Sequence, residues 1–465
     1  MGFNFNPACL LRNINIVAFI IICFANKVFA QPLTFEPVKQ DSVQLASLIS
    51  KFEKSYRQDI AALPSQNKKD LEEVYKMRWE NIKEKFDNKE IYTSAPAQKY
   101  LDAVVAEIAR GNPSLQSNDF HCFFSRSGVP NAMSIGEGVI VFNMGLFHRL
   151  NNESQLAFVL CHEISHFILK HSENSINKYV ATINSDEVQK ELRNIKRKQY
   201  NKRDQLDKLV KGVTFDSRRH SRDHEGQADS MALVFLHNTK FDLAEALTTL
   251  TLLDSIDVDT FKIDSSLAST FNSPDFPFKK KWLQKEDGLL SGHAIIKEDK
   301  KIEDSLKTHP DCKARIKTLE PIVKSLRVSV AKNIINQATF NQLQNAFRYE
   351  TIEYAFENEN YTRSLYYALE LLKMHQGDPY IVTQIGKIMN ACYSGQKEHT
   401  LSKHIDLPAP YFRPNYNLLL QFMQNLYLED YASISYHFLK QYQPVLNNYA
   451  HFKAAYETSI KIAKD

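Results

Sequence analysis

The amino-acid sequence predicts an α+β chain in which a mainly helical domain with a small β-sheet at its edge is followed by an all-α domain. Three observations lead to this prediction. An apolar, helix-forming stretch runs from about Glu153 to His171. Two short runs of β-branched and aromatic residues precede it, at residues 119–126 and 139–142. After Pro321 the composition becomes helical and aromatic up to the end of the chain.

The chain has 465 residues, which exceeds what one hydrophobic core usually organises. We expect a first domain over residues 31–325 and a second, α-helical domain over residues 326–465. Residues 1–30 have the pattern of a cleaved signal peptide, with Arg12, an apolar core and a small-residue cleavage site ending at Ala30. We therefore expect a periplasmic or secreted protein, with an uncleaved N-terminal anchor as the alternative.

Charge and hydropathy limit the partners of the mature chain. Loss of Arg12 and Lys27 with the signal peptide lowers the net charge from +4 to +2, so no general affinity for polyanions follows. The segment from Lys190 to Arg222 carries twelve Lys or Arg against four Asp or Glu. We interpret it as a solvated helical excursion and not as a nucleic-acid site, with anionic lipid headgroups as a further partner. At most a peripheral membrane contact is expected.

The elements follow in chain order. Residues 43–110 have helical periodicity and form a helical cover. The two strands are separated by the turn residues Gly136-Glu137-Gly138, and helices are expected at about 222–237 and 242–254. Residues 257–307 form an irregular loop whose aromatic residues look exposed, which predicts a lid, a binding loop or a disordered surface loop. The exposed-looking aromatic residues are Phe271, Phe276, Phe278 and Trp282.

The second domain contains four helical segments of about tetratricopeptide length. These are Tyr361 to Met374, Pro379 to Tyr393, Asn415 to Leu428 and Tyr431 to Tyr442. We expect tetratricopeptide-like helical hairpins, with an ordinary helical bundle as the alternative.

Residues 162–166 read His-Glu-Ile-Ser-His inside the first domain's apolar helix. A step of four residues advances an α-helix by about 400°, so His162 and His166 project from the same face and can hold one zinc ion. Glu163 follows the first ligand and can reach a water molecule in the open position of the metal. These residue types at this spacing are the minimal set for zinc-assisted hydrolysis of a peptide bond.

A catalytic zinc site of this kind needs a third protein ligand. One large class of zinc peptidases supplies a His six residues after the second His, but Ser172 stands there and His171 misses the position by one. Glu225 and Asp229 lie four residues apart on a predicted helix, so one carboxylate can bind the metal while the other accepts a hydrogen bond from a ligand imidazole. Two histidines beside them are alternative ligands, His220 and His224.

Several segments, in order, resemble the family-48 zinc metallopeptidases, gluzincins that include the CAAX prenyl endopeptidase, the HtpX heat-shock protease and periplasmic outer-membrane assembly proteases. The resemblance implies a zincin-like catalytic core over about residues 95–319. Since the membrane spans of the first two branches are absent, a periplasmic branch is the closer likeness. The similar segments are Pro130-Asn131-Ala132, Gly138 to Phe142, Gly145-Leu146, Glu153 to Ala157, the His162 motif, Arg222 to Asp229, Thr308-His309-Pro310 and Arg315-Ile316.

The resemblance also implies roles for individual residues. One zinc ion per chain would be held by three ligands, His162, His166 and Glu225. Glu163 would be the general base, and Asp229 would accept a hydrogen bond from a ligand histidine. His309 would lie near the metal as an oxyanion stabiliser or as an inhibitory ligand, and Arg315 would orient a carboxylate or a substrate carbonyl. Gln227 replaces the commoner acidic residue before Ala-Asp and is not expected to touch a ligand.

We therefore expect an exported zinc endopeptidase that acts on misfolded or envelope proteins, with outer-membrane or envelope proteins as partners. The strand at 138–142 is expected to hold substrate as an added antiparallel strand. The expected substrate-binding residues are Asn131, Ala132, Gly138, Val139, Ile140 and Arg315. One alternative is a chaperone-like interaction protein whose protease site is latent or gated by His309. Another is a deformylase-like hydrolase with Cys122 as a thiolate ligand.

Overall fold

The computed structural model describes residues 35–115, 120–197, 222–256, 258, 261–284, 312–326, 332–409 and 412–464. The predicted signal peptide, His309, His220 and most of the segments 190–222 and 257–307 lie outside the described residues. Within the described ranges, no helix combines the length and the apolar character needed to cross a bilayer.

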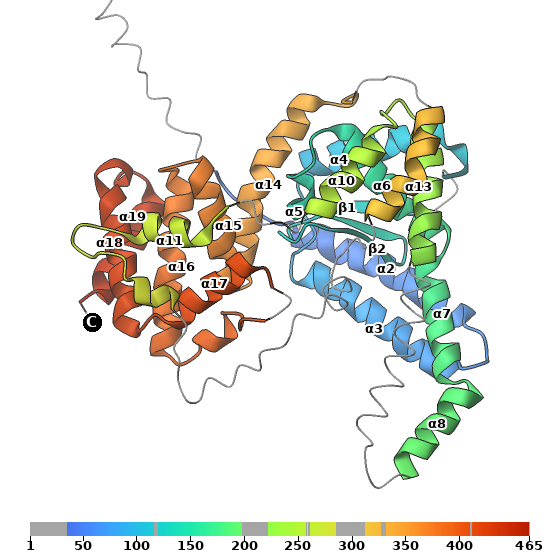
Figure 1. Cartoon of the computed structure of the whole chain (residues 1–465), viewed down its shortest axis with the longest axis horizontal. Helices are drawn as coiled ribbons and strands as arrows, with labels where there is room; N and C mark the ends of the chain where they lie inside the picture. The colour runs from blue at the N-terminus through green and yellow to red at the C-terminus, as the bar shows by residue number, and fades with distance from the viewer. Residues whose placement is uncertain are drawn as a thin grey trace, which may run out of the picture.

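The chain folds into two helical parts joined by α14, and the first part also contains a three-stranded sheet (Figure 1). The predicted α+β, mainly helical class is therefore confirmed. The first part comprises α2 (Ser42–Ala62), α3 (Lys68–Asp87), α4 (Ala95–Gly111), β1 (His121–Ser125), β2 (Ala132–Gly136), β3 (Val139–Asn143), α5 (Met144–Phe147), α6 (Glu153–Ile168), α7 (His171–Ile183), α8 (Asp186–Arg197), a helix over residues 222–237, α10 (Glu245–Ser255) and α13 (Cys312–Ser325).

The sheet has the strand order β1-β3-β2, so β3 is its central strand. β3 pairs with β1 in parallel and with β2 in antiparallel orientation. The expectation that residues 138–142 accept a substrate strand is therefore wrong, because both edges of this strand are already hydrogen-bonded. The strand β2, which the sequence reading missed, lies at the edge of the sheet instead.

A tight hairpin connects β2 to β3. Glu137 and Gly138 both have positive φ, of 53° and 71°, as a two-residue hairpin loop requires. Gly136 before them has φ of 105°, and a Cβ there would lie 2.8 Å from Nε of Arg78. Glycine at this position thus serves both the backbone conformation and the close approach of the arginine. The predicted turn at residues 136–138 is confirmed.

Both faces of the sheet are covered. Along β3, Ile140 and Phe142 pack into the cluster around α6, whereas Val139 and Val141 pack toward α2 and α3. Alternate side chains of a strand point to opposite faces, and a strand covered on both faces reads as a continuous apolar run. This explains why residues 139–142 contain no polar residue.

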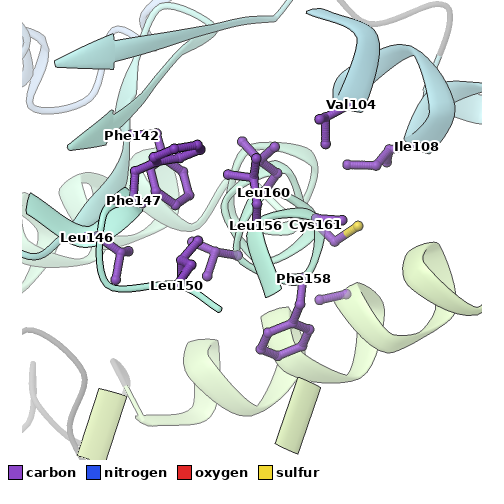
Figure 2. Packing of buried hydrophobic residues seen from close by; sticks show 14 of the residues in the cluster. Val104, Ile108, Phe142, Leu146, Phe147, Leu150, Leu156, Phe158, Leu160 and Cys161 are labelled. Atoms are coloured by element: carbon purple, nitrogen blue, oxygen red, sulfur yellow. The ribbon is translucent and has the colours of Figure 1, made fainter. Parts of the chain in front are cut away.

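The helix α6 runs through the middle of the first part and is buried along most of its length. Asn152 caps its N-terminus by accepting a hydrogen bond from the backbone N–H of Gln155 at 3.0 Å. Side chains of α4, β3 and α5 pack against α6, and Leu156 and Leu160 of α6 face Phe142 and Phe147 (Figure 2). The motif helix is thereby fixed within the core.

The second part is all-helical, as predicted, and its tetratricopeptide character stays a prediction. It comprises α11 (Ile263–Phe271), α14 (Gln337–Glu357), α15 (Tyr361–Met374), α16 (Pro379–Lys397), α17 (Pro414–Gln424), α18 (Leu428–Leu446) and α19 (Ala450–Ile462).

Residues 261–284 belong to the hydrophobic cluster of this second part, although they precede α13 of the first part in sequence. The expectation of an irregular, exposed loop is therefore wrong here. Phe271 is 3% exposed and Trp282 is 1% exposed, and Asn425 donates a hydrogen bond to the carbonyl of Trp282 at 3.0 Å. The aromatic residues that looked exposed contact the rings of Phe422, His437 and Phe438, which lie at least 140 positions later in the chain.

A buried carboxylate joins α6 to the segment that leads into α14. Glu153, with no exposed surface, accepts hydrogen bonds of 2.7 Å from the backbone N–H groups of Ile334, Ile335 and Asn336. The hydroxyl of Tyr100 donates to the same carboxylate at 3.0 Å. Four donors thus converge on one side chain at the start of the motif helix.

We expect Glu153→Gln to lower the free energy of unfolding by about 2 to 4 kcal/mol, because it removes charge-assisted hydrogen bonds and turns an amide N–H toward buried donors. Chemical denaturation monitored by circular dichroism measures this. Glu73→Gln, at an exposed position of α3, is the matched control and should change stability by less than about 0.5 kcal/mol. Equal stabilities of the two variants would contradict the assigned role of Glu153.

Candidate metal centre

Three side chains from two helices form a compact group of metal-ligating atoms. The ring nitrogens Nε2 of His162 and His166 lie 3.1 Å apart. The carboxylate oxygens of Glu225 lie 3.5 Å from Nε2 of His162 and 3.4 Å from Nε2 of His166. All three ligand atoms lie within 4.8 Å of one another, and this is the metal-ligand cluster found among the residues that the structure describes.

The spacing of these atoms fits a zinc ion. Zinc takes ligands at about 2.0 to 2.2 Å with tetrahedral geometry, which separates any two ligand atoms by roughly 3.4 Å. The two Nε2 atoms are 3.1 Å apart, and each lies 3.4 to 3.5 Å from a different carboxylate oxygen of Glu225, close to this value. Two imidazoles and one carboxylate are also a known donor set for catalytic zinc. The residues present therefore fit the ion that the sequence predicts.

The two helices bring these ligands together for local reasons. His162 and His166 occupy successive turns of α6, whose opposite side packs into the core. Glu225 and Asp229 occupy successive turns of the 222–237 helix. Ala228 in that helix has no exposed surface, and its small side chain lets the helix approach α6 closely.

Asp229 links the ligand histidine to an arginine. Its Oδ1 lies 3.0 Å from Nδ1 of His162, and Arg315 of α13 donates two hydrogen bonds to its carboxylate, at 2.6 and 2.7 Å. Nη1 of Arg315 also lies 3.0 Å from Oε2 of Glu225. The structure thus places Asp229 beside a ligand histidine, and places Arg315 against two carboxylates.

These contacts determine the protonation states of the metal-free site. Burial alone would lower the pKa of His162, but the close carboxylates of Asp229 and Glu225 outweigh burial and raise the pKa to about 10. Burial would raise the pKa of Asp229, but Arg315 and His162 reverse this and lower it. The pKa of Glu225 is lowered as well, because its two histidines and Arg315 outweigh the effect of burial.

Glu163 lies beside the ligand group and faces the cavity. Its Oε2 accepts a hydrogen bond of 2.9 Å from the backbone N–H of Ser134 in β2. Burial, opposed by the two ligand histidines, raises the pKa of this carboxyl group above its usual value. A carboxylate with a raised pKa is suited to accept a proton near neutral pH.

The ligand group opens into a cavity of about 430 Å³. Strand β2 forms one wall of it, with Asn131, Ala132 and Ser134 among the lining residues. Two of the expected substrate-binding residues, Asn131 and Ala132, therefore do lie at the cavity. Gly138, Val139 and Ile140 do not line it, since they belong to the turn and to the central strand.

A further histidine lies behind the ligand group, and the sequence reading gave it no role. Nδ1 of His171 is 2.9 Å from Nδ1 of His166, and its Nε2 is 3.1 Å from Oε1 of Gln227. The ring of His224 stacks on that of His171, with centroids 4.1 Å apart. The sequence signal for this residue is its position five residues after His166, directly beyond the motif helix.

The alternative metal ligands are not supported. His224 stacks on His171 and is not part of the ligand group. Cys122 lies buried on β1 and is not part of that group either, and burial raises the pKa of its thiol far above the usual range. Gln227 contacts no ligand directly, as predicted, although it reaches His166 through His171. His309 lies outside the described residues.

Comparison with known proteins agrees with this geometry. No curated protein matches the chain at a significant level. Residues 95–323 match the model of Peptidase family M48, a range that contains all three ligands, Glu163, Asp229 and Arg315 and nearly coincides with the predicted core over residues 95–319. Family M48 is zinc-dependent. Residues 95–323 therefore form a metallopeptidase domain of peptidase family M48.

Proposed function

We propose that this protein is an exported zinc endopeptidase that cleaves peptide bonds in protein substrates. The observation that carries the proposal is the convergence of the ligand atoms of His162, His166 and Glu225 within 4.8 Å of one another, with Glu163 beside them on the cavity wall. A ligand set, a proton acceptor and an open cavity are together what metal-assisted hydrolysis requires.

A zinc ion held by these three ligands would supply Lewis-acid activation of water and of the scissile carbonyl group. Glu163 accepts the proton of the attacking water and returns it to the leaving amine. Asp229 holds His162 with Nε2 directed toward the ligand group, and Arg315 in turn holds Asp229. His309, as predicted from the sequence, would add oxyanion stabilisation or inhibition.

The substrate is proposed to bind as an extended segment along β2. This strand lies at the edge of the sheet and lines the cavity. The N–H of Ser134 points away from β3, since it donates to Glu163, so the free side of β2 faces the catalytic group. Pairing through main-chain atoms makes few demands on side chains, which supports a loose sequence preference.

Export and the nature of the substrates rest on the sequence. The signal peptide at residues 1–30 supports a periplasmic or secreted location, in which misfolded or envelope proteins are the proposed substrates and outer-membrane or envelope proteins the proposed partners. The chaperone-like alternative with a latent site is less well supported, because the ligand set and the proton acceptor are both in place.

We expect Glu163→Gln to bind one zinc ion per chain and to lose at least about 100-fold in the rate of cleavage of an unfolded protein, because a neutral amide cannot accept the proton. Atomic emission measures the zinc content, and gel electrophoresis measures the cleavage. Glu187→Gln, at an exposed position of α8, should cleave at the wild-type rate. Wild-type activity in Glu163→Gln would rule out this mechanism.

Zinc binding should release at least one proton per ion between about pH 7 and 9. The metal-free His162 has its pKa raised to about 10, so it is protonated below that pH, and a zinc ligand must give up this proton. The apparent zinc affinity should therefore rise by about tenfold per pH unit in this range. Calorimetric titration in buffers of different ionisation enthalpy counts the protons. Proton-neutral binding would contradict the raised pKa of the metal-free His162.

A further inference from the structure

The two ligand histidines have different partners behind them. Each directs Nε2 toward the ligand group, so each presents Nδ1 to a neighbouring side chain. For His162 this neighbour is a carboxylate, Asp229. For His166 it is a second imidazole, that of His171, with the two Nδ1 atoms 2.9 Å apart.

This difference matters because only one tautomer of a neutral histidine can bind a metal through Nε2. The proton must then be on Nδ1. A carboxylate is only an acceptor, so Asp229 by itself holds the Nδ1 proton of His162 in place. A neutral imidazole can donate or accept, so His171 alone does not determine the tautomer of His166.

Gln227 resolves this ambiguity. Its side-chain oxygen lies 3.1 Å from Nε2 of His171, and an amide oxygen only accepts hydrogen bonds. The Nε2 atom of a neutral His171 must therefore carry the proton, which leaves a lone pair on its Nδ1. His166 then donates its Nδ1 proton to His171 and keeps the Nε2 lone pair for a metal ion.

The position of His171 is well determined by its surroundings. It is the first residue of α7 and follows Lys170, whose φ of 53° interrupts the helical backbone between α6 and α7. Its side chain is 5% exposed, and the parallel ring of His224, tilted by only 8°, fixes the plane of its imidazole. The ring therefore has little freedom to move away from His166.

We propose that His171, oriented by Gln227, is a positioning residue that holds His166 in its metal-binding tautomer. This inference rests on the proposed zinc site and adds a second, uncharged hydrogen-bonding chain to the one through Asp229. The 222–237 helix takes part in all three features. It supplies the ligand Glu225, the hydrogen-bonding partner Asp229 of His162, and the Gln227 that orients His171, at every second position of the sequence.

The zinc affinities of three variants test the proposal. Competition with a chromogenic chelator should show that His171→Phe, which fills the space without an acceptor, binds zinc about 10 to 100 times more weakly than the wild type. Gln227→Leu removes only the orienting acceptor and should weaken binding by a smaller factor. Gln227→Glu retains an acceptor and should bind zinc at least as tightly as the wild type.

Gln227 is exposed, so its variants do not depend on core packing. Ser230→Ala, at an exposed position of the same helix, is the matched control and should bind zinc like the wild type. Unchanged affinity in both His171→Phe and Gln227→Leu would overturn the inference. If His171→Phe does not fold, wild-type affinity in Gln227→Leu alone overturns it.

Two further measurements separate positioning from a direct role in the reaction. In the zinc-loaded protein with ¹⁵N-labelled histidine, NMR should detect a proton on Nδ1 of His166 with a coupling across the hydrogen bond to His171. Activity of His171→Phe should also recover at zinc concentrations that saturate its weakened site, whereas activity that stays low at saturation would contradict a role through the metal. If the wild type itself binds no zinc, the proposed function fails, and not this inference alone.

Discussion

The constraint on which this structure depends is the close approach of two helices that lie some sixty residues apart in sequence. The α6 helix supplies two imidazoles, and the 222–237 helix must bring one carboxylate within about 3.5 Å of both. Arg315 from a third helix stabilises this approach by donating two hydrogen bonds to Asp229. The sheet, the helices that cover it and the hydrogen bonds to Glu153 hold α6 in the position where the 222–237 helix can approach it.

Charge balance explains why this arrangement favours a divalent cation. The carboxylates of Asp229, which is buried, and of Glu225, which is partly buried, both face the guanidinium group of Arg315. Without a metal the remaining negative charge is met by a proton on His162, whose pKa is raised for this reason. Buried charges are costly unless they are paired, so a metal ion that replaces this proton satisfies the site more completely. The ligand geometry and the electrostatics of the site thus both favour a divalent cation.

Much of the site could be predicted from the sequence because its information is local. The i, i+4 spacing of His162 and His166, and of Glu225 and Asp229, specifies helix faces directly. The strand order could not be predicted in this way, since five-residue strands carry little signal and β3 differs from an edge strand only through its partners. The same holds for residues 261–284, which looked like a loop because the helices that bury them come much later in the chain. His171 was missed because its role depends on the backbone break at Lys170 between α6 and α7, which helix periodicity does not specify.

Anomalous X-ray diffraction at the zinc absorption edge tests the central claim most directly. Crystals of the zinc-loaded protein should give one strong anomalous peak, at bonding distance from Nε2 of His162, Nε2 of His166 and the carboxylate of Glu225. A peak coordinated by other residues, or a Glu225 carboxylate turned away from both imidazoles, would contradict the account of the site and of the hydrolysis it supports.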